Sequence, residues 1–344
     1  MKNQVFGNIN GRILFGLLSL LINLLTFTTN CRAQISFEKV IDTLGSAQAS
    51  CVQQTFDGGY ILCGTSYLNG NDALFAKLDS LGGIEWIKSF SGLGIDGALF
   101  VSQLADSGFI ALAHNNLGLN TRSWLIRLDR YGDSLWTQQY SLGSGSTEPF
   151  GMAISYSGHY AITGNYQTLP PLNSYDTFLI LTDSNGQILY SDIYITSQGS
   201  QGMAVCNSLF GGYFVSGSKT ITSNSSDILL IRTNSIGDTI WTKTYDGSYS
   251  EIAFSVNETS DNGCIIGGAQ FNGMAFNMAL IKTDSIGGTL WSKTFFDSVE
   301  TFVRSVAQMP DDGYIIGGNI ASTNTMADMR SEEHTSELQS PLNI

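Results

Sequence analysis

Histidines are the first residues to test for chemistry, because the chain has only three of them and two, His114 and His159, lie well inside it. A catalytic histidine needs a nucleophile within hydrogen-bond reach, and such nucleophiles commonly lie in a short motif of the Gly-x-Ser-x-Gly type. No motif of this type accompanies either histidine. We therefore interpret both as structural or surface residues, and we predict no catalytic residue in this chain.

Carboxylates offer a second kind of chemistry, because glycoside hydrolysis uses two of them about 5–9 Å apart across the sugar. Most acidic residues of this chain recur at equivalent turn positions, which is typical of a structural role. Three acids fall outside that pattern and are the candidates for hydrolysis: Glu148, Glu251 and Glu300.

Calcium is the metal to consider, since it takes several oxygen ligands. Four carboxylates or amides occur at one recurring position, just ahead of an apolar run: Asp72, Asp176, Asp227 and Asn277. Turns and strand caps favour the same residue types, and no EF-hand spacing is present. We interpret these residues as turn formers and predict no metal site and no cofactor, with Ca²⁺ as the open alternative.

The cysteines and one glycine-rich segment are the next candidates. Cys51 and Cys63 are equidistant from a turn at Asp57, so they would face each other across a hairpin, as a disulfide or as two thiols; we favour thiols. No Cys-x-x-Cys spacing indicates a metal. Residues 92–97 match the letters Gly-x-Gly-x-x-Gly of the dinucleotide-binding motif, but no strand–helix unit surrounds them, which favours a loop.

Aromatic side chains in loops remain as candidates for ligand contact, because their rings offer flat apolar surfaces. We predict four tyrosines in variable loops as ligand-binding residues: Tyr67, Tyr166, Tyr175 and Tyr249. Other aromatic residues recur once per repeat and are expected to pack neighbouring units together: Trp86, Trp136, Tyr190, Trp241 and Trp291.

The elements that must position these residues repeat about every 50 residues. One landmark is a tight turn followed by an aromatic residue, as at residues 57–60, and we align its six copies on Gly59, Gly108, Gly158, Gly212, Gly263 and Gly313. A second landmark is Asp-Ser-x-Gly, followed four positions later by an aromatic residue, as at residues 79–86. The chain therefore consists of one unit repeated, with five complete copies and the beginning of a sixth.

Each unit contains four short apolar runs separated by turn residues, and no run has the 3.6-residue period of a helix. Four strands in about 50 residues is the size of one propeller blade, close to the kelch repeat and longer than WD40. We predict an all-β fold, a β-propeller of four-stranded blades with at least six repeats begun; an open β-repeat array is the alternative. Residues 35–41 match the fourth strand of a unit and would complete the last blade.

The connections between strands divide into two sets. Because successive strands alternate in direction, the turns between strands one and two and between strands three and four emerge on one face. The connections between strands two and three, and those between units, emerge on the other and differ in length and sequence. We call this second side the variable-loop face and expect any ligand there. Its loops include residues 66–72, 115–120, 143–148 and 166–175.

The beginning of the chain has the pattern of a secretory signal peptide at residues 1–33. A basic start precedes an apolar run at 13–27, and small side chains at Cys31 and Ala33 suit cleavage after Ala33. This run is shorter than the ~20 residues of a membrane span, so no transmembrane segment is expected after cleavage. Lipidation of Cys31 is the alternative.

The end of the chain also departs from the repeats. Residues 330–344 resemble, over their first part, the in-frame translation of a common sequencing adapter. We therefore predict that 330–344 is a non-native tail and that 34–329 is a repeat domain truncated in its sixth repeat.

Composition excludes several classes of protein. The chain is 42% hydrophobic and only 13% charged, whereas disordered chains carry more charge and fewer aromatic residues. Its net charge of −13 repels phosphate, so no nucleic-acid partner is expected. These numbers describe a globular chain with enough apolar material for a core, and they leave the oligomeric state open.

The two landmarks together, Asp-Gly-Gly-Tyr-Ile and Asp-Ser-x-Gly-x-x-x-Trp, resemble those of secreted bacterial β-propeller-like repeat proteins that are exported with a type IX secretion sorting domain. The resemblance covers residues 35–329 and implies residence at the cell surface or outside the cell. The second landmark is also similar to the tryptophan-docking repeat of quinoproteins, but the adjacent cysteine pair of those enzymes is absent here. Quinoprotein activity is therefore not implied.

Together these observations predict an exported binding or scaffold module of the bacterial cell surface or extracellular space, without catalytic residues. Its partner would be a glycan or a surface protein. The alternative is a carbohydrate-active hydrolase that uses the variable-loop face or a missing C-terminal domain.

Overall fold

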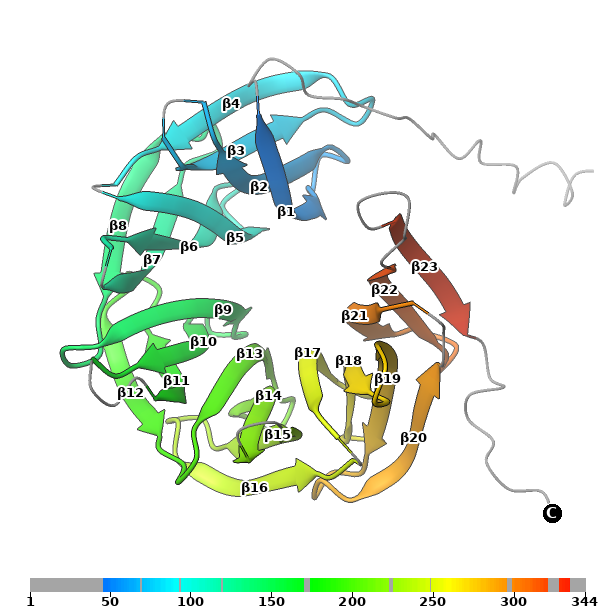
Figure 1. Cartoon of the computed structure of the whole chain (residues 1–344). Helices are drawn as coiled ribbons and strands as arrows, with labels where there is room; N and C mark the ends of the chain where they lie inside the picture. The colour runs from blue at the N-terminus through cyan, green and yellow to red at the C-terminus, as the bar shows by residue number, and fades with distance from the viewer. Residues whose placement is uncertain are drawn as a thin grey trace, which may run out of the picture. The chain divides into compact units, whose positions relative to one another are not determined.

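Every regular element in the described part of the chain is a β-strand (Figure 1). The computed structural model describes residues 46–68, 70–92, 94–118, 120–169, 174–222, 225–247, 249–295 and 299–320, together with the backbone of 328–334. The strands form five four-stranded sheets and one three-stranded sheet, all antiparallel and each ordered as in the sequence. The predicted all-β fold of repeated four-stranded blades is confirmed at this level.

The sheets are numbered 1 to 6 along the chain. Sheet 1 contains β1 (Ala47–Gln54), β2 (Tyr60–Ser66), β3 (Asp72–Leu78) and β4 (Ile84–Phe90); sheet 2 contains β5 (Ile95–Gln103), β6 (Phe109–Asn116), β7 (Thr121–Leu128) and β8 (Ser134–Tyr140). Sheet 3 contains β9 (Ser146–Ile154), β10 (Tyr160–Gln167), β11 (Tyr175–Thr182) and β12 (Ile188–Tyr194); sheet 4 contains β13 (Ser200–Asn207), β14 (Tyr213–Thr222), β15 (Ser225–Thr233) and β16 (Thr239–Tyr245). Sheet 5 contains β17 (Glu251–Glu258), β18 (Cys264–Phe271), β19 (Phe276–Thr283) and β20 (Thr289–Phe295); sheet 6 contains β21 (Thr301–Gln308), β22 (Tyr314–Ile320) and β23 (Asp328–His334).

The predictions made for the two ends of the chain are only partly covered by the described residues. β23 pairs with β22 and includes residues 330–334 of the predicted non-native tail. A backbone ladder of this kind forms whatever the side chains are, so the origin of the tail stays a prediction. The predicted signal peptide at 1–33 and the predicted fourth-strand segment at 35–41 lie outside the described residues. Among the residues that are described, no helix has the length and apolar character needed to cross a membrane.

The turn between the first and second strand of each unit has a residue with positive φ at one equivalent position. The residues at this position are Gly58, Ser107, Gly158, Gly211, Asn262 and Asp312, with φ between 65° and 83°, and in sheet 4 Gly212 also has positive φ. Glycine adopts this conformation without a Cβ clash, and short polar residues tolerate it at a small cost. Gly158 is thus equivalent to Gly58, and His159 occupies the place of Gly59. The predicted alignment of Gly158 with Gly59 was wrong by one residue.

The turn between the third and fourth strand explains the Asp-Ser-x-Gly landmark. In sheet 1, Asp79 Oδ1 accepts hydrogen bonds from the backbone N–H groups of Leu81 (2.8 Å) and Gly83 (2.7 Å). Equivalent bonds form at Asp129, Asp183, Asn234 and Asp284. The landmark is therefore a side-chain-stabilised turn.

A β-bulge interrupts the first strand of every sheet at the same position. The bulged residues are Ser50, Leu99, Phe150, Met203, Phe254 and Arg304. A bulge brings the first strand close to the second strand, and glycine usually stands opposite. A Cβ on Gly268, for example, would lie 2.0 Å from the carbonyl oxygen of Ile252. The bulge also re-aims its own side chain, a feature that the sequence analysis did not predict.

Consecutive sheets pack on one another through the first strand of the later sheet, which contacts the first three strands of the sheet before it. The recurring aromatic residues add a second contact. A Cβ on Gly287, in the β19–β20 turn, would lie 2.8 Å from the Trp241 ring of sheet 4, and Tyr245 Oη donates to the Gly287 carbonyl oxygen at 3.0 Å. Trp86, Trp136, Tyr190 and Trp241 each lie against a turn glycine of the next unit, and Trp291 contacts Tyr314 of sheet 6, so the predicted blade-to-blade role is confirmed.

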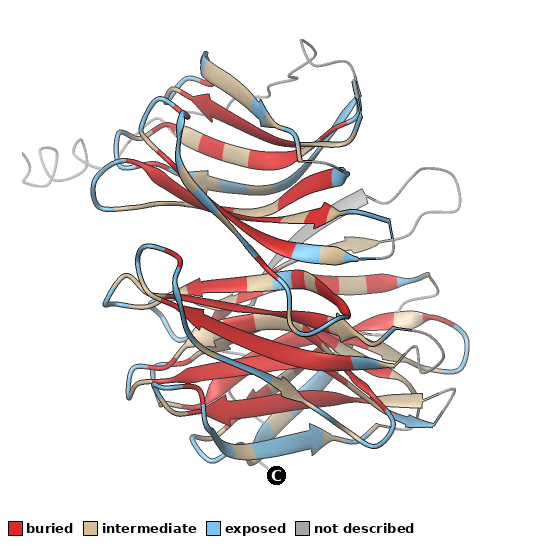
Figure 2. Ribbon diagram, turned by 90° about the vertical axis from the view of Figure 1, so that its left-hand side faces the viewer, coloured by how far each residue is buried: buried red, intermediate tan, exposed pale blue. Residues whose placement is uncertain are grey.

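Burial follows this packing. The third strands β7 and β11 are buried at almost every position, because sheets cover both of their faces, whereas the fourth strands β8 and β12 are largely exposed (Figure 2). The cores are shared between sheets: Ile61 and Phe75 of sheet 1 belong to one cluster with Val101 and Phe109 of sheet 2.

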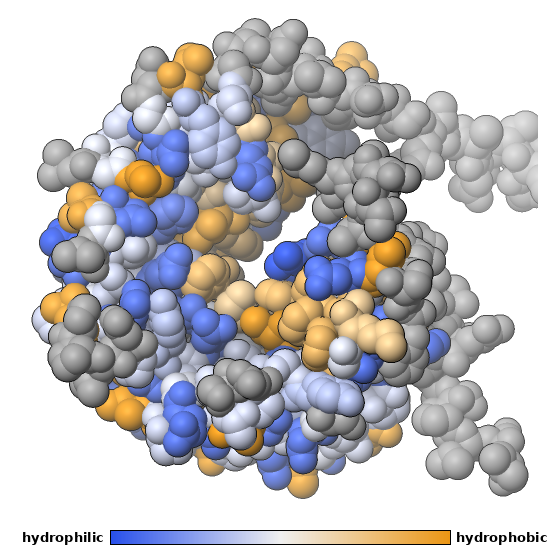
Figure 3. Space-filling model, viewed as in Figure 1, coloured by the Kyte–Doolittle hydropathy of each residue, from blue (hydrophilic) through white to orange (hydrophobic). Residues whose placement is uncertain are grey.

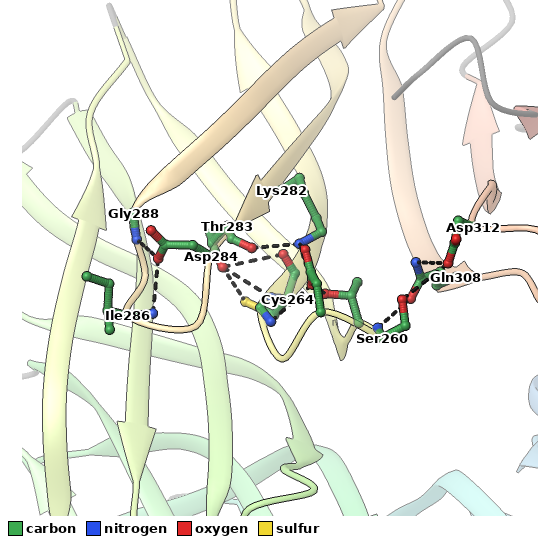
Figure 4. Close-up of polar contacts among 12 residues, drawn as sticks. Ser260, Cys264, Lys282, Thr283, Asp284, Ile286, Gly288, Gln308 and Asp312 are labelled. Carbon is green, nitrogen blue, oxygen red and sulfur yellow. Dashed lines mark hydrogen bonds and ion pairs between the residues drawn. The ribbon is translucent and has the colours of Figure 1, made fainter. Parts of the chain in front are cut away.

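Third strands also carry a buried cation that the sequence analysis missed. The side chains concerned are Lys77, Arg127, Arg232 and Lys282. Lys282 Nζ donates to both carboxylate oxygens of Asp261 (2.9 and 2.8 Å) and to the Thr283 carbonyl oxygen (2.7 Å; Figure 4). Sheet 3 has Leu181 in the position of the cation and Ser157 in the position of the acid. Sheet 3 thus lacks both the cation and the acid. This joint replacement is the pattern in the sequence that could have predicted the ion pair.

Sheet 4 replaces the acid in a different way. Phe210 stands in the acidic position, and Arg232 donates to Ser208 Oγ (2.9 Å) and to the Gly211 carbonyl oxygen (2.8 Å). Ser208 donates in turn to Glu258 of sheet 5 at 2.8 Å. The buried cation therefore obtains its negative partner from the next unit.

Candidate functional site

The variable-loop face contains one hollow that brings three sheets together. Its volume is about 460 Å³, and it lies where β11, β13, β14, β15, β17 and β19 begin or end. Its lining is formed mainly by hydroxyl and amide side chains: Ser174, Gln198, Gln201, Ser218, Thr220, Thr222, Ser225, Ser226 and Ser250, with Tyr175, Gly199, Glu251, Ile252 and Phe276. We call it the polar hollow.

One of the four predicted tyrosines lies in the polar hollow. Tyr175 lines the polar hollow and is 39% exposed. Tyr67 and Tyr249 are also exposed, and Tyr67 Oη donates to Gln48 Oε1 at 3.1 Å. Tyr166 is half-buried against the core of sheet 3, and its hydroxyl oxygen accepts the N–H of Gly145 at 3.3 Å. Of the four, Tyr175 is therefore the one that the fold places in the polar hollow.

Glu251 is the single acid in the lining. It is 4% exposed, and Oε1 accepts a hydrogen bond from Gln270 Nε2 at 3.2 Å. Oε2 is enclosed and has no hydrogen-bond partner among the described residues. Burial raises the pKa of Glu251 because the charged carboxylate loses its hydration, and the negative charges of Asp227 and Asp246 act in the same direction. Protonation is thus favoured relative to an exposed glutamate.

The polar hollow continues into a chain of aromatic rings. Tyr249 contacts Phe271 edge to face at 6.1 Å, Phe271 contacts Phe276 at 5.2 Å, and Phe276 stacks on Phe302 at 5.6 Å between ring centroids. Phe302 in turn contacts Phe254 at 6.1 Å. Figure 3 shows an apolar surface over β17 to β19 and β21, the elements that carry most of this chain. We call these five residues the aromatic chain.

The aromatic chain is not a requirement of the repeat. The positions equivalent to Phe254 carry Ser50, Leu99, Phe150 and Met203 in sheets 1 to 4. In sheet 6 this position is Arg304, whose guanidinium lies 4.6 Å from the Phe254 ring centroid and 5.4 Å from that of Phe302. Because this position accepts serine, leucine, methionine and arginine as well as phenylalanine, the blade itself does not need an aromatic ring there.

The other acids predicted for hydrolysis are not brought together. Glu148 lies in β9, Glu251 begins β17 and Glu300 is exposed just ahead of β21, so the three belong to different sheets. Burial raises the pKa of Glu148, but only Glu251 lines the polar hollow. His114 is half-buried in β6, where burial lowers its pKa, and His159 lies in the turn before β10.

The residues considered for calcium occupy the beginnings of third strands in four different sheets. Asp176 Oδ1 accepts the N–H of Thr196 at 2.9 Å, and Asn277 Nδ2 donates to the Ala275 carbonyl oxygen at 3.0 Å. Asp72 is the first residue of β3, and Asp227 lies two residues after the start of β15. In the part of the chain that the structure describes, no three His, Cys, Asp or Glu side chains come together as a metal-binding group.

Comparison with known proteins places the fold. No protein-family model matches the sequence, and no curated protein matches it. Among solved structures, a protein of unknown function from Dyadobacter fermentans is similar with a TM-score of 0.57 at 8% identity, over 83% of this chain and 94% of that one. An ulvan lyase, a polysaccharide lyase, is similar with TM-scores of 0.57 and 0.58 in two structures at 8% identity, over 87% of this chain and 81% of that one. At this identity the likeness shows the fold alone.

Proposed function

We propose that this protein is an exported, non-catalytic module that binds a glycan in the polar hollow. The observation that carries the proposal is the lining itself: neutral hydroxyls and amides from three sheets, beside the exposed ring of Tyr175. Sugars present many hydroxyl groups and flat C–H faces, which such groups and rings complement. The described residues of the lining include no Lys or Arg, so the chemistry of the polar hollow suits an uncharged sugar rather than an anion.

The comparisons support this choice of ligand class. One structure of the ulvan lyase carries bound -[GlcA(1-4)Rha3S]-, so a protein with a similar fold holds a polysaccharide. That polysaccharide is acidic, so the proposal of an uncharged ligand for the present chain rests on its own lining. In the present chain the three acids considered for hydrolysis lie in separate sheets, which is the reason to propose binding without hydrolysis.

The test is binding of neutral and acidic polysaccharides to the full chain, measured by calorimetry after an array screen. Tyr175→Ala and Gln201→Ala should each weaken the affinity for a neutral glycan about tenfold, because each removes one contact of the order of 1.4 kcal/mol. Tyr131→Ala is the matched control, since Tyr131 is 58% exposed in the turn between β7 and β8, away from the variable-loop face. Equal effects of all three variants, or no binding by the wild type, would refute the proposal.

A hydrolase is the second candidate, and the observation that favours it is Glu251. A buried carboxyl with a raised pKa in a cavity is a typical general acid. A hydrolase would release reducing ends from the bound glycan, and Glu251→Gln would abolish this release while Glu148→Gln and Glu300→Gln would not. Release of reducing ends that all three variants retain would exclude Glu251 as the acid.

We also propose that the blades form a β-propeller outside the cytoplasm. The six consecutive sheets and the signal-peptide pattern at 1–33 support this, as does the resemblance to proteins exported through the type IX system. Export would yield a mature protein that begins at Gln34, which N-terminal sequencing of protein recovered from outside the cytoplasm would detect. An intact Met1 in that fraction would contradict the proposal.

A further inference from the structure

Cys51 and Cys63 face each other directly across the first hairpin. They are paired residues in the ladder between β1 and β2, and their two thiols form a hydrogen bond. Directly opposed residues of an antiparallel pair have Cα atoms about 4.5–5.5 Å apart, which lies inside the range of about 4.4–6.8 Å that a disulfide spans. The pairing therefore brings the two cysteines within the range of a disulfide, and both are free thiols in this structure.

This thiol pair occurs in only one of the six equivalent places. The paired residues at this position in sheets 2 to 6 are Phe100 with Leu112, Gly151 with Thr163, Ala204 with Ser216, Ser255 with Gly267 and Ser305 with Gly317. The blade therefore needs no cysteine at either position. The other two cysteines of the described chain, Cys206 and Cys264, lie in different sheets and form no such cross-strand pair.

The first strand of sheet 1 is also the one that a covalent link would stabilise most. All eight positions of β1 are exposed or half-exposed, whereas β5, its equivalent in sheet 2, has four buried positions. Little apolar burial fixes β1, so its attachment depends on the ladder to β2. A covalent bond between the two strands would restrict their separation.

We propose that in the exported protein Cys51 and Cys63 are joined by a disulfide that fastens β1 to β2. The oxidant is a disulfide bond, either in a small molecule or in a thiol oxidase. The Cys51 thiolate attacks one of the two sulfur atoms of this bond. The oxidant's S–S bond breaks, one thiolate leaves, and a mixed disulfide forms on Cys51. Cys63 then loses its proton and attacks the Cys51 sulfur, which releases the second thiolate. Two protein thiols are oxidised and one disulfide is reduced to two thiols.

The local environment suits this order of events. Cys51 is half-exposed, and its hydrogen bond with Cys63 lowers the pKa of the Cys51 thiol to about 7, so a large fraction is thiolate at neutral pH. The same hydrogen bond raises the pKa of the Cys63 thiol, and burial of Cys63 raises it further. Once Cys51 carries the mixed disulfide, it holds no negative charge against Cys63, and the second step becomes easier.

Peptide mapping of the full chain tests the bond directly. The protein is equilibrated with oxidised or reduced glutathione, unfolded in a denaturant that contains an alkylating agent, and cut with trypsin. Trypsin leaves Cys51 and Cys63 together on one peptide, residues 40–77. The oxidised sample should yield this peptide unalkylated and lighter by two hydrogen atoms, with Cys206 and Cys264 alkylated in both samples. Alkylation of Cys51 and Cys63 in the oxidised sample, or linkage of either to another cysteine, would overturn the proposal.

A second measurement separates a fastening bond from an incidental one. The urea midpoint of the oxidised wild type should fall when a reductant is added, and the midpoint of a Cys51→Ser, Cys63→Ser double variant should not respond. Cys206→Ser should keep the response of the wild type. A bond that forms without any reductant-dependent shift would refute the fastening role. Glycan binding plays no part in either readout, so the two proposals stand or fall separately.

Discussion

Loss of the acid from a buried ion pair is the most informative change, and Asp261→Asn in sheet 5 provides it. The Lys282 side chain is 4% exposed and that of Asp261 is 50% exposed, with Nζ and Oδ2 2.8 Å apart. The substitution keeps the turn, because an asparagine Oδ1 still accepts from Thr259 Oγ1 and the N–H of Gly263. It removes the charge that compensates Lys282, and it replaces Oδ2, which accepts from Lys282 Nζ at 2.8 Å, with an amide nitrogen that cannot accept.

The expected cost follows from this geometry. Removal of one partner from a fully buried pair costs about 3–5 kcal/mol, because the remaining charge is left uncompensated. Water reaches the half-exposed site of Asp261, and Lys282 keeps its bond to the Thr283 carbonyl oxygen, so we expect about 2 kcal/mol. Urea unfolding followed by tryptophan emission measures it, with Trp291 opposite Lys282 in the β19–β20 ladder as the local reporter.

Two further variants make this prediction refutable. Asp261→Ser with Lys282→Leu copies the residues that sheet 3 has naturally and should return to within about 1 kcal/mol of the wild type, since no buried charge remains. Asp133→Asn removes an exposed partner of Lys88 and should cost less than about 1 kcal/mol although that pair is closer, at 2.6 Å. Equal losses for Asp261→Asn and Asp133→Asn would show that burial does not control the energy of these pairs.

Three other changes test the packing and the acid of the polar hollow. Gly287→Ala should lower the free energy of unfolding in urea by about 2 kcal/mol, because the added Cβ meets an indole of sheet 4. Gly118→Ala is the control, since Gly118 also has positive φ but a Cβ there would have no atom within 4 Å, and it should lower the free energy by about 1 kcal/mol. Equal losses would argue against the packing of Gly287 on the indole. Tyr140→Phe removes a 2.7 Å hydrogen bond to the Gly186 carbonyl oxygen and should lower the free energy of unfolding by about 1 kcal/mol, and an unchanged value would contradict this. The folded-state pKa of Glu251 is raised, so its stabilising contribution is present below its unfolded pKa and is lost as pH rises through the folded pKa. Glu251→Gln should therefore lose less stability than the wild type as pH rises above about 4, the ordinary pKa of a glutamate, in the same assay, and identical pH profiles would refute this account.

Local patterns were sufficient to predict the blade. A turn that needs positive φ and an aspartate that bonds backbone N–H groups two and four residues ahead act over a few residues, so their signatures repeat wherever the turn repeats. One detail failed, at Gly158, because serine, asparagine and aspartate also adopt this conformation and the glycine shifts by one position between copies. The recurring aromatic residues were interpreted correctly because a contact made in every unit leaves a periodic trace.

The candidate site is different, because its parts come from segments far apart in the sequence. Tyr175 and Glu251 could be named as unusual residues, but only the packing of sheets 3, 4 and 5 places both in one lining with Ser218 and Gln201. The buried position of Lys282 likewise depends on the neighbouring sheet that covers it. Repetition thus determined the strands, the turns and the stacking contacts from the sequence alone. The hollow and the aromatic chain were decided by tertiary structure, since each arises where non-equivalent side chains of different units meet. The buried cations recur in four sheets, but their burial was also decided by tertiary structure, because it depends on the sheets that cover them.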